Sequence, residues 1–248
     1  MSSRVLMSKI APTPLWRWFF FGVIPLGLFF SIGFAVTAYQ ETHVALPAGL
    51  ANEFAIRRSL TTLMNLSPLP NRAAPDFSLV DQSGGAVSLN QFRGKAVVLA
   101  FLDSRCTQVC PIIAQEFVVA ERSLGADALH VEFVGVNVDP RSNSVADVAR
   151  FTRVHGLAGF SNWHFLTGSL RRLVPVWRSY GIEVALAKGA AQTVHSSYLY
   201  FINPLGYERY LADATVFQSE SGRAYLPPGL IGRWGRGIAS YLKKSQGE

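Results

Sequence analysis

The two cysteines of this chain are the residues most able to do chemistry, and they lie four positions apart. Cys106 and Cys110 enclose the stretch CTQVC, which follows an apolar run and stands at the expected start of a helix. Two cysteines placed at random in a chain of this length would fall so close only about 3% of the time, so the spacing indicates that they act together. A count of two also excludes a dense disulfide framework.

Three chemical roles are open to this cysteine pair. On a regular helix the two Cβ atoms would lie about 5 to 6 Å apart, whereas an unstrained disulfide needs roughly 3.5 to 4.5 Å, so a disulfide requires Cys106 to lie on the loop. A metal ion bridging two thiolates relaxes that demand, and the spacing alone favours a metal site. The third role is a pair of inert buried thiols, which the loop position and the polar neighbours disfavour.

The expected position at a helix N-terminus lowers a thiol's pKa, because unpaired N–H groups and the positive end of the helix dipole stabilise the thiolate. Both a soft-metal ligand and a redox nucleophile need the thiolate form. Arg105 adds a cation directly before Cys106, and we expect it to lower the pKa of the thiols further. These residues therefore leave metal binding and thiol–disulfide exchange both open, and they do not choose the metal.

Alternating strands and helices must position the pair. Two continuous apolar runs, 96–102 and 131–138, are typical of strands buried on both faces of a sheet. Helices are expected at 109–124, 144–155, 169–180 and 230–244, although three glycines weaken the last pattern. Hairpins are expected at 74–89 and 197–211. This order predicts an α/β fold, a mixed sheet with helices on both faces.

An uncharged segment near the N-terminus predicts a membrane anchor. Residues 18–40 contain no charged side chain, and a helix rising about 1.5 Å per residue would cross the hydrocarbon layer over that length. Arg4, Lys9 and Arg17 precede the segment, so the positive-inside rule leaves the N-terminus in the cytoplasm and the remaining chain beyond the membrane. A signal peptide cleaved near residues 36–38 is the alternative.

The expected organisation follows from these segments. Residues 1–17 are a cytoplasmic N-terminus, 18–40 the transmembrane anchor, 41–73 a connector with a proline-containing break at 67–71, and 74–248 the globular domain. The net charge of +7 includes the three cations before the anchor. The other basic residues form no block and do not interleave with aromatic residues, so we expect no nucleic-acid binding.

With these features in place, the chain resembles the Sco/SenC family, membrane-anchored thioredoxin-like proteins associated with copper delivery to cytochrome oxidase. The resemblance runs from about Ala74 to Leu211, and its most specific part is CTQVCP at 106–111, which fits the family's CxxxCP motif. FRGK at 92–95, VDPR at 138–141 and VHS at 194–196 support it. Asp139, within VDPR, either borders the site or forms a turn before Pro140.

The resemblance implies a thioredoxin-like fold and a copper site formed by Cys106, Cys110 and His195. Two thiolates and a neutral imidazole suit Cu(I), which prefers soft ligands, but zinc accepts the same set, so the choice of copper rests on the resemblance. The implied protein is a single-pass protein of the plasma (inner) membrane. Its extracytoplasmic domain would deliver copper to the copper-site subunit of cytochrome c oxidase during assembly.

The alternative function is a thiol–disulfide oxidoreductase that reduces the cysteines of the same oxidase site. In that role Cys106 would be the attacking thiolate and Cys110 the resolving thiol. A peroxiredoxin-like peroxidase is disfavoured, because residues 99–103 lack the Pro and the Thr or Ser that this family places before its nucleophile.

Overall fold

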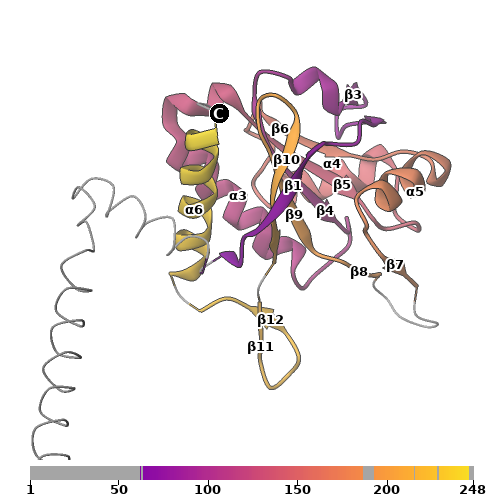
Figure 1. Cartoon of the computed structure of the whole chain (residues 1–248). Helices are drawn as coiled ribbons and strands as arrows, with labels where there is room; N and C mark the ends of the chain where they lie inside the picture. Colours follow the sequence, from indigo (N-terminus) through magenta and orange to yellow (C-terminus); the bar gives the residue numbers. More distant parts are fainter. Residues whose placement is uncertain (1–61, 63, 187–192, 215, 228, 246–248) are drawn as a thin grey trace, which may run out of the picture. The chain divides into compact units, whose positions relative to one another are not determined.

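A computed structural model describes residues 62, 64–186, 193–214, 216–227 and 229–245 (Figure 1). The chain divides into two units, Met1–Phe54 and Ala55–Glu248, and all described residues belong to the second. The expected cytoplasmic segment 1–17 and anchor 18–40 therefore lie outside the described residues. Within the described part of the chain, no helix combines the length and the apolar character needed to cross a bilayer.

A six-stranded mixed sheet forms the centre of the second unit. Its strand order is β1-β10-β9-β4-β5-β6, in which β4, β5 and β6 run parallel and the pairs β4–β9, β9–β10 and β10–β1 are antiparallel. All residues of β4 and β5 are buried, as the two apolar runs predicted. The strands are β1 (Ser67–Ala73), β4 (Ala96–Leu102), β5 (Val131–Asn137), β6 (Trp163–Leu166), β9 (Tyr198–Ile202) and β10 (Tyr207–Asp213).

Helices cover both faces of this sheet, as expected (Figure 1). One face packs against α3 (Cys110–Leu124), α4 (Val145–Val154) and α6 (Leu230–Ser245). The other face packs against α5 (Leu170–Ser179), the turn η1 (Leu89–Phe92) and the hairpin of β2 (Ser78–Val80) and β3 (Ala86–Ser88). Successive side chains of β4 alternate between the two cores. The strand is therefore packed on both faces up to the point where it leads into the cysteine loop.

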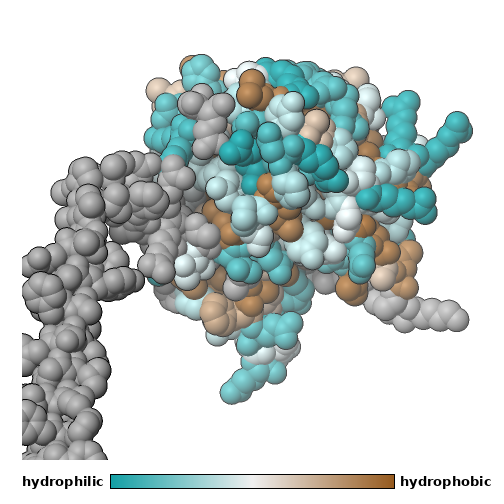
Figure 2. All heavy atoms as spheres, viewed as in Figure 1, coloured by the Kyte–Doolittle hydropathy of each residue, from teal (hydrophilic) through white to brown (hydrophobic). Residues whose placement is uncertain are grey.

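Smaller elements complete the unit. The turn η2 (Gly125–His130) joins α3 to β5. Besides the β2–β3 hairpin, two further short antiparallel pairs of the described residues lie outside the main sheet: β7 (Val184–Ala185) with β8 (Val194–His195), and β11 (Phe217–Gln218) with β12 (Ala224–Tyr225). The β11–β12 hairpin projects from the body of the domain, and its tip is hydrophilic (Figures 1 and 2).

Residues 67–71 form part of the edge strand β1 rather than the expected break. Pro68 and Pro70 cannot donate to a ladder, but β1 pairs on one side only, and its register with β10 shifts between Pro68 and Arg72. Prolines are tolerated at such edges and irregularities. The sheet therefore begins at Ser67, before the boundary expected at Ala74.

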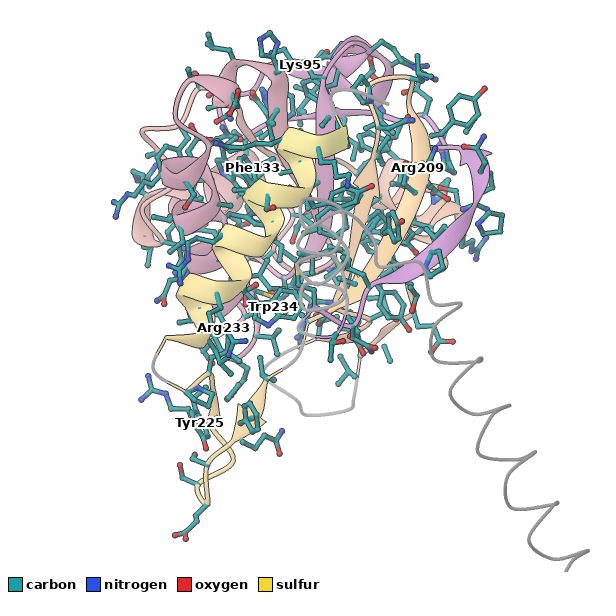
Figure 3. The ribbon with its side chains drawn as sticks, turned by 60° about the vertical axis from the view of Figure 1, so that its left-hand side comes forward. Lys95, Phe133, Arg209, Tyr225, Arg233 and Trp234 are labelled. Atoms are coloured by element: carbon teal, nitrogen blue, oxygen red, sulfur yellow. The ribbon has the colours of Figure 1, made fainter. Side chains whose placement is uncertain are left out.

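The helix α6 forms in spite of its glycines, and Gly235 shows why one of them is there. A Cβ atom at this position would lie 2.5 Å from Cβ of Val119 and 2.7 Å from the carbonyl oxygen of Glu116, both in α3. Gly235 therefore allows close contact between the two helices. Trp234 beside it is buried in the core (Figure 3).

Candidate metal centre

The two cysteines lie where the central strand β4 passes into α3. A short loop follows Leu102 and carries Cys106, which is half-buried, while Cys110 is the first residue of α3 and is fully buried. The expectation that Cys106 stands on the loop before the helix is confirmed. Both residues are free thiols in this structure.

Hydrogen bonds from its own loop surround the sulfur of Cys106. The backbone N–H groups of Gln108 and Cys110 donate to Cys106 Sγ at 3.4 and 3.5 Å. The thiol of Cys110 also donates to this sulfur, and that bond is the largest cause that lowers the pKa of Cys106 to about 6, against the opposing effect of burial. Cys106 is therefore mainly a thiolate at pH 7.

Arg105 does not produce this low pKa, contrary to the expectation from its position. Its Nε donates to the buried Asp139 Oδ2 at 2.6 Å, so its cation is paired with that carboxylate. The causes that lower the pKa of Cys106 are instead the Cys110 thiol and backbone N–H groups.

The pKa of Cys110 is shifted in the opposite direction to that of Cys106. Its hydrogen bond to Cys106 and its burial both raise the pKa of the Cys110 thiol well above the ordinary value. The backbone N–H of Asp103 donates to Cys110 Sγ at 3.4 Å. Near neutral pH the pair therefore shares one proton, with the thiolate on the accessible member and the thiol on the buried one.

His195 reaches this pair from the short strand β8. Its Nε2 lies 3.8 Å from Cys110 Sγ, and its Nδ1 lies 3.0 Å from the carbonyl oxygen of Ser196. A carbonyl oxygen can only accept, so Nδ1 carries the proton and the lone pair of Nε2 faces the sulfur. Burial lowers the pKa of His195, which keeps the imidazole neutral at pH 7. A neutral ring with Nε2 free is the form that binds metals.

Two buried carboxylates join the cysteine loop to the segment that carries His195. Asp103 accepts from the backbone N–H of Arg105 at 2.6 Å and from that of Thr193 at 3.4 Å. Asp139, which is paired with Arg105, also accepts from the Thr193 hydroxyl at 3.4 Å. Both roles left open for Asp139 are present: its carboxylate accepts from the backbone N–H of Arg141 at 2.9 Å in the turn, and it also borders the site through Thr193. The sequence analysis did not single out Asp103. The feature that could have identified it is its position as an acidic residue directly after a buried strand.

In the structure each of the other two expected ligands approaches Cys110, but the three do not converge on one point. Cys110 contacts Cys106 on one side and His195 on the other. No group of three or more His, Cys, Asp or Glu side chains among the described residues converges closely enough to hold a metal ion. Binding of one ion by all three donors therefore requires a rearrangement of side chains. The donor set itself, two sulfurs and one imidazole nitrogen, fits a soft ion.

Comparisons with known proteins agree with this architecture. A family model described as SCO1/SenC matches residues 67–217. The SCO1 protein homolog of Bacillus subtilis is 27% identical over 141 residues, which cover 56% of this chain and 72% of that protein.

Two solved structures are similar in fold. Bradyrhizobium japonicum ScoI, solved with copper bound, has a TM-score of 0.53 at 22% identity and matches 70% of this chain and 99% of its own. BsSco, described as a member of the Sco family of cytochrome c oxidase assembly proteins with a disulfide switch, has a TM-score of 0.54 at 22% identity, over 73% of this chain and 96% of its own. The expected α/β fold, a mixed sheet flanked by helices, is confirmed.

Proposed function

The chain belongs to the SCO1/SenC family, and from this premise we propose that it binds Cu(I) through Cys106, Cys110 and His195. The observation that carries the proposal is the approach of His195 Nε2 to within 3.8 Å of Cys110 Sγ, with Nδ1 engaged by a backbone carbonyl. This arrangement presents a free nitrogen lone pair beside a sulfur. The copper-bound ScoI structure, from the same family, supports the choice of metal.

The protonation states of the donors suit capture and release. Cys106 is already a thiolate near neutral pH, whereas Cys110 must lose its proton when the ion binds. Copper uptake should therefore release a proton and should weaken as the pH falls. Three ligands also leave room for a donor from a partner, which is what transfer of the ion requires.

We propose that the protein delivers this copper to the copper-site subunit of cytochrome c oxidase during assembly. The description of BsSco as a cytochrome c oxidase assembly protein supports this role. We further propose that residues 18–40 anchor the chain in the plasma (inner) membrane, with the domain outside the cytoplasm. After intact cells are treated with a membrane-impermeant reductant and a Cu(I) chelator, a membrane-impermeant maleimide should label Cys106, and no labelling before lysis would contradict this location.

The decisive experiment is a Cu(I) competition titration of the reduced full chain, in mild detergent, against a chromogenic chelator. We expect one tightly held Cu(I) per chain, and failure to take copper from the chelator would refute the proposal. His195→Ala should abolish tight binding. His155→Ala is the matched control, because His155 is also partly buried but contacts Phe151 rather than a cysteine.

A second function is favoured by the unequal pair of thiols. Cys106 is accessible with a lowered pKa, and Cys110 is buried directly beside it, which suits an attacking and a resolving cysteine. Cys106 would attack one sulfur of a target disulfide and release the other as a thiolate. Cys110 would then attack Cys106 Sγ, which releases the second target thiol, so that the target gains two electrons and the pair is oxidised to a disulfide.

The same variant separates the two functions. His195→Ala should leave disulfide exchange by the cysteine pair intact while it abolishes tight Cu(I) binding. Loss of both by this single change would instead indicate that the ring is needed to shape the thiol pair itself.

A further inference from the structure

A groove opens beside Cys106 on the face formed by the cysteine loop and α4. Its volume is about 560 Å³. Three arginines from three separate elements line it, together with apolar side chains of α4, and none of its lining residues is acidic. The lining residues used below are Arg105, Cys106, Arg150, Phe151, Val154 and Arg223.

The arginines retain hydrogen-bonding capacity toward the groove. Arg105 uses Nε for Asp139, and the side chain is 36% exposed. Arg150 lies 3.6 Å from Asp147 and is 52% exposed. Arg223 is exposed and forms no ion pair with any side chain that the structure describes. Because a guanidinium carries five N–H donors and one acid occupies only part of that fork, each arginine can still bind a carboxylate.

The floor of the groove is apolar. Phe151 is buried beneath it, whereas Val154, one turn further along α4, is 70% exposed. An exposed aliphatic side chain in a groove that arginines also line favours a ligand that combines acidic groups with an apolar one.

The β11–β12 hairpin supplies one wall. The backbone N–H of Ala224 donates to Gln108 Oε1 at 2.7 Å, which ties the hairpin to the cysteine loop and places Arg223 at the groove. Phe217 and Tyr225 form a ring pair on the hairpin and are both about half exposed. Figure 3 shows Tyr225 on this projection, near the start of α6. The match to the family model ends at 217, so most of the hairpin lies outside the matched region.

We propose that this groove binds an acidic segment of the partner protein with which Cys106 exchanges copper or a disulfide bond. Carboxylates of that segment would lie against the three arginines, and an apolar side chain would lie against Val154. This inference rests on the proposed function and specifies the chemistry of the partner at the same site. Charge complementarity of this kind raises the rate of encounter and sets the choice of partner.

The test uses two peptides of equal length, each with one cysteine and one leucine, flanked in one by glutamates and in the other by lysines. Each cysteine is blocked as a 2-thiopyridyl disulfide. The Cys106 thiolate attacks the peptide sulfur, a disulfide forms between Cys106 and the peptide, and the S–S bond to the thiopyridyl group breaks. The released thiolate takes a proton to give pyridine-2-thione, whose absorbance reports the rate. Rates are divided by those with 2-mercaptoethanol, which correct for the intrinsic reactivity of each peptide.

With the reduced full chain in mild detergent, the acidic peptide should react about 10-fold faster than the basic one at low salt. This ratio should approach one at about 0.5 M salt, where exposed charges are screened. The double variant Arg150→Glu/Arg223→Glu should remove the preference. The control double variant Arg171→Glu/Arg178→Glu changes the net charge equally on α5, which covers the opposite face, and should keep it.

Equal rates for the two peptides, or an undiminished preference in Arg150→Glu/Arg223→Glu, would overturn the groove assignment. Neither result would argue against copper binding, which is measured separately by the chelator titration. Conversely, a chain that takes up no Cu(I) but still prefers the acidic peptide would refute the copper function and uphold the groove.

Discussion

The cysteine segment (residues 103–110) and the histidine segment (residues 193–196) form one site by different means. The cysteine segment lies between a fully buried strand and a long helix, and its own backbone N–H groups hold the sulfur of Cys106. The histidine segment contains only the two-residue strand β8, paired with the equally short β7. His195 comes within 3.8 Å of Cys110 across 85 residues of sequence. The cysteine segment is thus positioned locally, and the histidine segment is positioned by distant contacts.

Besides the approach of His195 to Cys110, two acidic residues outside the histidine segment connect it to the rest of the site. Asp103 belongs to the cysteine segment, and its carboxylate receives the N–H of Thr193. Asp139, from the end of the neighbouring strand, receives the Thr193 hydroxyl. Damage to the cysteine segment should therefore displace the histidine, whereas damage to the histidine segment should leave the cysteines in place.

Removal of a ligand from either segment should give the largest effect. Cys110→Ser and His195→Ala should each weaken Cu(I) binding by more than ~100-fold, since loss of even an outer-shell partner costs about 10- to 100-fold. Only Cys110→Ser should also lower the free energy of unfolding, by about 1 to 3 kcal/mol, because it places a hydroxyl in the core. Denaturant unfolding and chelator titration measure the two effects. Equal losses of stability would contradict the difference between the segments.

The proton shared by the cysteines should be visible in the pH dependence of alkylation. The thiolate is the reactive form, so the rate for Cys106 should rise with pH through its pKa of about 6 and level off above it. In Cys110→Ala the donating thiol is lost, and the midpoint should move upward toward the ordinary thiol value. The rate at pH 6 should then fall about 10- to 100-fold.

Iodoacetamide modification followed by mass spectrometry gives both alkylation profiles. His195→Ala is the matched control and should leave the midpoint near that of the original chain, because the pKa of Cys106 is lowered by the Cys110 thiol and by backbone N–H groups. A shift in the control as large as that in Cys110→Ala would show that the histidine segment also shapes the thiols.

Asp103→Ala should test the connection between the segments. Without the carboxylate, Thr193 loses a partner and His195 is less well held, so Cu(I) affinity should fall about 10-fold. Asp103→Asn keeps an acceptor oxygen and should recover part of the affinity. NMR of the His195 ring protons in the metal-free protein should show the altered environment in Asp103→Ala.

Glu208→Gln is the control for Asp103→Ala, because Glu208 is equally buried but is paired with Arg72. It should lower stability without changing Cu(I) affinity. Unchanged affinity and ring signals in Asp103→Ala would show that the histidine segment is positioned independently.

Gly235→Ala should give the smallest effect on the site, since it acts on the side of α3 that packs against α6 and not on the cysteines themselves. The new methyl group would press on Val119 and on the backbone of α3, and should lower the free energy of unfolding by about 1 to 3 kcal/mol. Gly232→Ala is the matched control, because its Cβ would meet only the end of the flexible Arg236 side chain. That change should stabilise the protein by up to ~1 kcal/mol. Urea unfolding compares the pair, and equal values would exclude helix contact as the reason for Gly235.

Sequence patterns predicted the locally determined parts of the molecule well. The apolar runs identified β4 and β5, and the cysteine spacing identified the loop and the start of α3. The break predicted at 67–71 was wrong, because it relied on the prolines, and only the position of β1 at the sheet edge makes them compatible with a strand.

The distant contacts of the site could not be predicted from local patterns. His195 was identified through the family resemblance alone, since a histidine beside a two-residue strand carries no periodic signal. The partnership of Asp103 with Thr193 spans 90 residues and depends on the folded arrangement of the sheet. Pairing of Arg105 with Asp139 likewise cancelled the effect that its place in the sequence suggested.

The close packing of α6 on α3 gives this last helix an influence on the candidate metal centre. α6 supports the helix that begins with Cys110, and it starts just after the hairpin that walls the groove (Figure 1). A nonsense mutation or proteolytic cut before residue 230 would remove that support while every proposed ligand remained present. Truncated forms of this protein should therefore bind copper more weakly although their cysteine motif and histidine are complete.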